Sequence, residues 1–219
     1  MNARRRALAV AVSGGILIAA AVLMHSYALP RAAEAGSYDG SASGLAAASD
    51  QLWHQDSPGV AGAAEPFDQF GDAVASGDFN GDGELDLAIG VPFEDIDGTD
   101  DAGAVNVLYG SADGLAAAGN QIWHQDVADI GGLAESDDVF GRALAAGDFN
   151  GDGRDDLAIG VPPEDVGSVV NAGAVNVLYG SASGLAAAED QIWHQDVADV
   201  QGAVEAGDHF GDALAAGDF

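Results

Sequence analysis

The feature that most constrains the fold of this chain is a repeat with a period of 70 residues. Its tryptophans fall at Trp53, Trp123 and Trp193, and the block Gly-Asp-Phe-Asn-Gly-Asp-Gly at residues 77–83 returns unchanged at residues 147–153. A long fixed period is typical of a supersecondary unit that packs against copies of itself. Complete units span residues 70–126 and 140–196, whereas residues 37–56 match only the end of a unit and residues 210–219 only its beginning.

Within each unit the pattern is that of β-strands. Leu157, Ile159 and Val161 share one face of a run that Pro162 closes, and the same alternation returns over residues 175–179. Period two, β-branched residues and Gly or Pro punctuation all favour strands. The alanine triplets at residues 116–118 and 186–188 could form a helical turn, but no amphipathic run is long enough for a helix. The sequence predicts an all-β fold with about four strands per unit, as in the blades of a β-propeller.

Oxygen-bearing side chains alternate along the loop predicted between the first two strands of each unit. A glycine at loop position 6 (Gly83, Gly153) permits the positive φ of a tight turn. Such a loop suits Ca²⁺, which accepts six to eight oxygen ligands in flexible geometry. The predicted ligands are Asp78, Asn80, Asp82, Glu84 (backbone carbonyl) and Asp86, then Asp148, Asn150, Asp152, Arg154 (backbone carbonyl) and Asp156, with Asp218 opening a third loop.

An EF-hand is the competing use of such a loop, and the sequence argues against it. An EF-hand requires a bidentate Glu at position 12 and a helix on each side. Position 12 is occupied by Ile89 and Ile159 here, and Gly-Val-Pro follows each loop and prevents a helix from continuing.

The charge of the chain restricts its partners. It carries 36 Asp and Glu against six Lys and Arg, a formal net charge of −30, and no cysteine. Such acidity disfavours nucleic acid and anionic membranes and favours cation binding. Most of the excess is interpreted as solvated surface, because only about a quarter of the acids lie in the predicted loops.

The N-terminus resembles a leader. Three arginines at residues 4–6 precede an apolar run over residues 7–24, and Ala33-Glu34-Ala35 offers a small-x-small cleavage pattern. Residues 1–35 are therefore predicted to be a signal peptide, with an uncleaved membrane anchor as the alternative. Both place residues 36–219 outside the cell, so the sequence predicts a secreted or cell-surface protein.

These motifs resemble the FG-GAP repeats of the integrin α-subunit propeller, in the form found in bacterial secreted proteins. Phe70-Gly71, Phe140-Gly141 and Phe210-Gly211 match the FG element, while Gly-Val-Pro at residues 90–92 and 160–162 replaces Gly-Ala-Pro. The resemblance implies a propeller, usually of seven blades, in which the loop residues named above hold Ca²⁺.

Two complete units cannot close a ring. The chain is therefore predicted to be a fragment whose remaining blades lie in the same longer protein. The alternative is a short subunit that assembles into a ring in trans.

Other residue groups favour no further chemistry. His54, His124 and His194 occur once per unit and are interpreted as structural, because a zinc ion at ~2.1 Å would not reach equivalent positions of separate blades. The acidic loops at residues 94–101 and 135–138 are interpreted as solvated, with additional calcium ligands or a partner surface as alternatives. No catalytic constellation is visible, so enzymatic activity is left open.

The sequence thus predicts a secreted calcium-binding module that binds an extracellular protein or carbohydrate. The alternatives are an accessory propeller of a secreted hydrolase of the phospholipase D type, and a structural envelope component.

Overall fold

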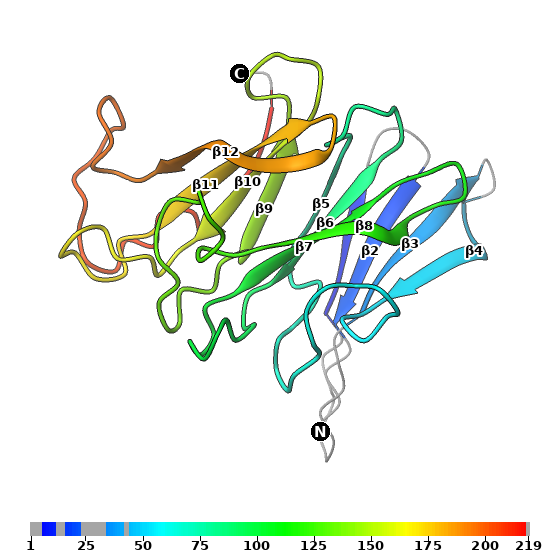
Figure 1. Cartoon of the computed structure of the whole chain (residues 1–219), viewed down its shortest axis with the longest axis horizontal. Helices are drawn as coiled ribbons and strands as arrows, with labels where there is room; N and C mark the ends of the chain where they lie inside the picture. The colour runs from blue at the N-terminus through cyan, green and yellow to red at the C-terminus, as the bar shows by residue number, and fades with distance from the viewer. Residues whose placement is uncertain (1–5, 12–15, 23–33, 42–43, 218–219) are drawn as a thin grey trace.

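A computed structural model describes residues 6–11, 16–22, 34–41 and 44–217. These residues form twelve strands in three four-stranded antiparallel sheets, and no helix occurs among them. The three sheets lie side by side, with the sheet of β5–β8 between the other two (Figure 1). The all-β prediction is confirmed.

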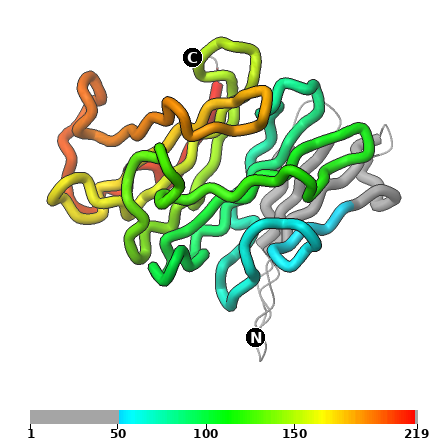
Figure 2. Tube along the Cα trace, in the orientation of Figure 1, coloured from blue at the N-terminus to red at the C-terminus, as the bar shows by residue number. Residues whose placement is uncertain are grey.

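Each complete repeat forms one sheet whose strands follow chain order. The first repeat contains β5 (Val74–Gly77), β6 (Asp86–Val91), β7 (Ala104–Tyr109) and β8 (Ala116–Trp123). The second contains β9 (Ala143–Gly147), β10 (Asp156–Val161), β11 (Ala174–Ser181) and β12 (Gly184–Trp193). Between the two sheets the chain crosses from the outer strand β8 to β9 through residues 124–142 (Figure 2). The predicted four strands per unit are confirmed.

The alanine triplets do not form helical turns, so that expectation is wrong. They lie in β8 and β12, where Ala116 pairs with Tyr109 and Ala186 pairs with Tyr179. In both sheets the pairing shifts register between this tyrosine and the valine two residues before it. The other two alanines of each triplet lie in the irregular stretch before pairing resumes at Gln121 and Gln191. The paired residues on either side keep this segment in the sheet, against the weak helical preference of three alanines.

The second strand of each sheet divides its side chains between two cores. Leu157, Ile159 and Val161 of β10 pack in a core that also contains Phe79 and Val105 of the first repeat. Ala158 belongs to a separate core on the other face of the sheet. The shared face that the sequence predicts is therefore the face that packs against the preceding repeat.

The two most conspicuous glycine motifs meet where one repeat packs on the next. Gly141, at φ +90°, lies against Ala104 and Gly90, so the glycine of Phe-Gly in one repeat contacts the glycine of Gly-Val-Pro in the repeat before it. The backbone N–H of Phe140 donates to the carbonyl of Ala102 at 2.9 Å. Phe210 and Ala172 repeat this contact at the next junction, also at 2.9 Å. The spacing of the two motifs thus encodes sheet-to-sheet packing.

The N-terminal sheet contains β1 (Arg6–Ala11), β2 (Ile16–Val22), β3 (Glu34–Ser41) and β4 (Gly44–Trp53). The hairpin β3–β4 corresponds to β7–β8, as the partial repeat at residues 37–56 predicts, and β1 and β2 occupy the first two places. Residues 1–5, 12–15 and 23–33 of the predicted leader lie outside the described residues, and its cleavage stays a prediction. Within the described ranges, no helix has the length and apolar character to cross a membrane.

Candidate calcium-binding loops

Residues 78–86, here called loop 1, join β5 to β6, as the sequence predicts. Asp78 accepts hydrogen bonds from the backbone N–H groups of Gly81 (2.8 Å), Asp82 (3.1 Å) and Gly83 (2.9 Å). Gly81 and Gly83 have φ of +74° and +93°, which lets the chain wind around this carboxylate. Asn80 and Asp82 in turn accept from backbone N–H groups two residues further on, both at 2.8 Å. The loop is wound so that its backbone surrounds its own acidic side chains.

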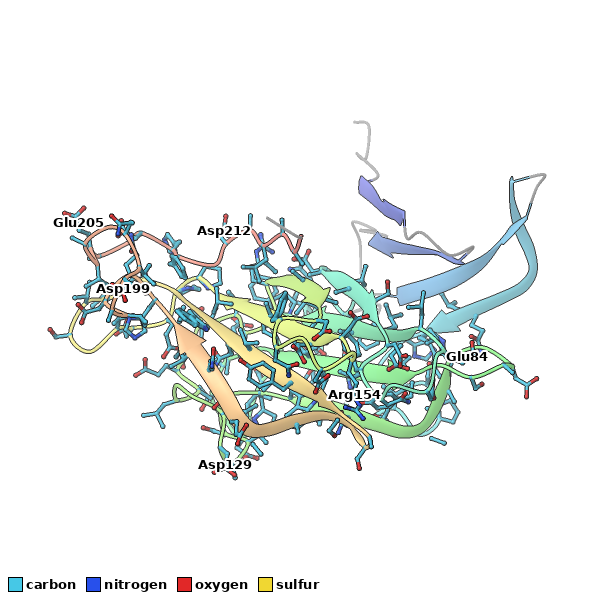
Figure 3. All side chains as sticks on the ribbon, turned by 90° about the horizontal axis from the view of Figure 1, so that it is seen from above. Glu84, Asp129, Arg154, Asp199, Glu205 and Asp212 are labelled. Carbon is cyan, nitrogen blue, oxygen red and sulfur yellow. The ribbon has the colours of Figure 1, made fainter. Side chains whose placement is uncertain are left out.

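Residues 148–156, here called loop 2, join β9 to β10 and repeat this geometry. Asp148 accepts from Gly151 (2.7 Å), Asp152 (3.1 Å) and Gly153 (2.9 Å). Asn150 accepts from the N–H of Asp152 at 2.8 Å, and Asp152 accepts from that of Arg154 at 2.9 Å. Glu84 and Arg154, labelled in Figure 3, occupy equivalent positions in the two loops. Asp218, the predicted start of a third loop, lies outside the described residues.

The last carboxylate of each loop is buried. Asp86 accepts from Phe79 N–H at the start of its loop and from Gly110 N–H beyond β7, both at 2.8 Å. Burial raises the pKa of Asp86 to about 6, against the lowering effect of these hydrogen bonds, and the nearby charges of Asp82 and Asp78 raise it further. Burial likewise raises the pKa of Asp156. A cation beside either carboxylate would offset the cost of burying its charge.

The donor set of each loop is all oxygen, which suits a hard cation such as Ca²⁺. The loops do not draw their carboxylates into a tight cluster, however. Among the described residues, three potential metal ligands lie within 4.8 Å of one another in one place only, and that place is outside the loops. All three are acidic side chains. The side-chain oxygens of the loops are instead engaged by backbone N–H groups, as described above.

That tighter group is Glu65, Asp68 and Glu94, near the opposite end of β6 from loop 1. Glu94 and Asp68 are buried, and the Gln55 amide donates to Glu94. Burial raises the pKa of Asp68 to about 6 and that of Glu94 to about 7, and each carboxylate lies near further acidic groups that raise it too.

The second repeat has a matching set. Glu164 and Asp138 are buried, Gln125 donates to Glu164, and burial raises the pKa of each carboxyl to about 7. The expectation of solvated loops is therefore wrong for Glu94 and Asp138. The signal that could have identified them is their recurrence, because Asp68 and Glu94 return 70 residues later while many other acids do not.

A surface pocket of about 660 Å³ adjoins the first of these clusters. Its walls combine acidic and aromatic side chains from the segment before β5 and the segment after β6: Glu65, Pro66, Phe67, Asp68, Gln69, Phe93, Asp95, Asp100 and Asp101. Loop 1 and this pocket thus lie at opposite ends of β6.

Four-stranded antiparallel sheets that recur with an aspartate-rich loop between their first two strands define a class, the β-repeat proteins with propeller-type blades. A family model for the FG-GAP repeat matches residues 70–108 and 140–178. The chain therefore contains two FG-GAP repeats, and the predicted resemblance is confirmed.

Curated proteins are similar to part of this chain. The chain is 35% identical over 127 residues to phosphatidylinositol-glycan-specific phospholipase D of Rattus norvegicus. This match covers 58% of the chain and 15% of that protein. It is 34% identical over 128 residues to integrin alpha-3 of Cricetulus griseus, covering 58% of this chain and 11% of the integrin. The chain is also 34% identical over 125 residues to integrin alpha-6 of Homo sapiens, and this match covers 56% of the chain and 10% of that integrin. The similarity is thus confined to a small part of each relative.

Proposed function

We propose that loops 1 and 2 each bind one Ca²⁺ and that the ions stabilise the two FG-GAP sheets. The observation that carries this proposal is the identical winding of both loops around the same sequence of side-chain oxygens. The ligands would be the side chains at loop positions 1, 3, 5 and 9 together with the backbone carbonyl at position 7.

Calcium would act on stability through charge. The three aspartate ligands proposed for each loop repel one another, and the innermost of them (Asp86 or Asp156) is buried. An ion that binds only the folded loop stabilises it by RT ln(1 + [L]/Kd), about 2.7 kcal/mol when calcium is a hundredfold above Kd. Loops of extracellular modules typically have Kd values of ~10⁻⁴–10⁻³ M, which extracellular calcium can fill.

Thermal unfolding in Ca²⁺ and in EGTA tests this proposal. We expect EGTA to lower Tm and added Ca²⁺ to restore it, while Mg²⁺ at the same concentration restores less. The double variant Asp82→Ala, Asp152→Ala should unfold at the same temperature with and without calcium. An unchanged Tm of the unaltered protein in EGTA would contradict the proposal.

We further propose that the protein is exported and serves as a binding or adhesion module for an extracellular protein or carbohydrate. Three observations support this: the leader-like N-terminus, the similarity to proteins named as integrin alpha subunits, and the pocket near residues 65–69. The pocket offers charged and aromatic contacts at the end of the sheet opposite the calcium loops.

Export and binding can be tested separately. N-terminal sequencing of the protein recovered from outside the producing cell should begin near Gly36, whereas an intact N-terminus in a membrane fraction would support the anchor instead. Binding to arrays of extracellular proteins and glycans should weaken with the double variant Asp95→Asn, Asp100→Asn at the pocket and persist with Asp113→Asn away from it. No binding above background would contradict the adhesion role.

A second candidate is an accessory propeller of a secreted hydrolase, favoured by the similarity to phosphatidylinositol-glycan-specific phospholipase D. A structural role in the envelope is the third. A hydrolase domain elsewhere in the same reading frame would favour the accessory role, and a cell-wall anchor would favour adhesion or structure.

A further inference from the structure

Loop 1 is held in place by a residue of loop 2. The backbone N–H of Asp155 donates to the carbonyl of Asp78 at 3.0 Å, and the N–H of Asp78 donates to the Asp155 carboxylate at 2.8 Å. Both backbone groups of the first ligand position of loop 1 are therefore bonded to the neighbouring repeat. Gly77 provides the space, because a Cβ there would lie 2.7 Å from Cβ of Asp155.

The preceding residue, Arg154, extends over the same loop. A Cβ added to Gly81 would lie 3.0 Å from Nε of Arg154 and 3.2 Å from its Cγ. Nε is buried without a hydrogen-bond partner, and Nη1 lies 3.6 Å from the Asp152 carboxylate. The guanidinium thus lies between Gly81 of loop 1 and Asp152 of loop 2.

The sequence treats these two positions differently in the two repeats. Where loop 2 has Arg154 and Asp155, loop 1 has Glu84 and Leu85. Beyond residue 31 the chain has only two arginines and no lysine, and both arginines contact the first repeat. The other, Arg142, pairs with Asp72 at 2.6 Å. The polar side chains that contact loop 1 therefore belong to the second repeat, and the first repeat has no equivalent of them at the same positions.

We propose that Asp155 is a positioning residue for the cation site of loop 1, and that Arg154 sets the affinity of that site through its charge. Asp155 fixes the backbone of Asp78, so the first carboxylate of loop 1 is presented in one orientation before an ion arrives. Arg154 places a positive charge beside loop 1, and this charge repels a calcium ion that binds there. This inference rests on the proposed calcium binding and adds that the first site is complete only when the second repeat packs against it.

A spectroscopic titration of loop 1 tests this proposal with Tb³⁺ as the probe. Glu84→Trp places an indole at position 7, where only the backbone carbonyl is a predicted ligand. Tb³⁺ bound in loop 1 is then measured as the luminescence of this variant minus that of the protein with Glu84. Displacement by Ca²⁺ then gives the calcium affinity of that loop. Position 84 is exposed, so the indole does not disturb the core.

Asp155→Leu, which introduces the residue that loop 1 carries at the same position, should weaken calcium binding in loop 1 by about tenfold, as is usual for residues that orient metal ligands. Asp155→Asn keeps an acceptor for Asp78 N–H and should restore most of the affinity. Asp129→Asn, which removes a charge far from Arg154 (Figure 3), should have no effect.

Arg154→Gln supplies an independent test with the opposite sign, because removal of its charge should strengthen binding in loop 1. Loop-1 affinities of Asp155→Leu and Arg154→Gln within twofold of the parent would overturn the inference, as would equal weakening by Asp155→Leu and Asp155→Asn. Failure of the parent to bind Tb³⁺ or Ca²⁺ at all would instead contradict the proposed calcium binding.

Discussion

Loops 1 and 2 have nearly the same sequence but different surroundings. Phe79 of loop 1 is 0% exposed and packs in a core shared with the second repeat, whereas the equivalent Phe149 of loop 2 is 46% exposed. Asp155 and Arg154 cover loop 1, and no residue in the described part of the chain covers loop 2 in the same way. The burial of the first repeat is therefore completed by the second, because each sheet is only one layer of a core.

The largest expected difference concerns the two phenylalanines. Phe79→Ala removes a fully buried ring and should cost about 3–5 kcal/mol of unfolding free energy. Phe149→Ala removes a half-exposed ring and should cost about 1 kcal/mol. Urea unfolding of both variants in saturating calcium measures the difference. Equal losses would show that the surroundings of the two loops do not differ energetically.

A smaller difference separates two glycines of equal backbone conformation. Gly141 and Gly153 both have φ of +90°, but a Cβ on Gly141 would lie 2.7 Å from the Ala104 carbonyl, whereas a Cβ on Gly153 meets nothing within 4 Å. Gly153→Ala should therefore cost only the backbone strain, about 1 kcal/mol, and Gly141→Ala about 3 kcal/mol.

Chemical denaturation in EGTA separates packing from any effect on calcium. If Gly141→Ala is no more destabilising than Gly153→Ala, the close approach of the two repeats at Gly141 is not required for stability.

The buried carboxylates, in contrast, have the same surroundings in both repeats. Burial raises the pKa of both Glu94 and Glu164 from 4.5 to about 7. The folded chain therefore binds more protons than the unfolded chain between these values, and stability should fall as pH rises through this window.

Melting temperatures from pH 5 to pH 8 in EGTA measure this dependence. Glu94→Gln and Glu164→Gln should each flatten the profile by a similar amount, whereas Asp113→Asn in an exposed turn should not. A Tm that rises steadily from pH 5 to pH 8 would contradict the direction of the pKa shifts.

Much of the fold could be predicted from the sequence, because repetition separates structural residues from the rest. The number of strands per unit, the loop between the first two strands of each sheet and the shared face of Leu157, Ile159 and Val161 follow from periodicity and residue pattern. The alanine triplets could not be assigned in this way, because a strand of small residues is stabilised by its cross-strand partners rather than by its own pattern.

The candidate site was predictable in part. The loop residues and the positive φ of Gly83 follow from local sequence, and the structure places them in one turn. Contacts between repeats carry no such signal. Asp155 reads as a loop residue of the second repeat, although its hydrogen bonds go to Asp78 of the first. Glu94 reads as a solvated acid, although folding buries it beside Asp68.

Calorimetric titration of the chelator-treated chain with CaCl₂ measures directly how many calcium ions the two loops bind. We expect saturable binding of two ions per chain, and of one ion per chain with Asp82→Ala. Absence of binding at millimolar calcium, or an unchanged number of ions with Asp82→Ala, would contradict this expectation.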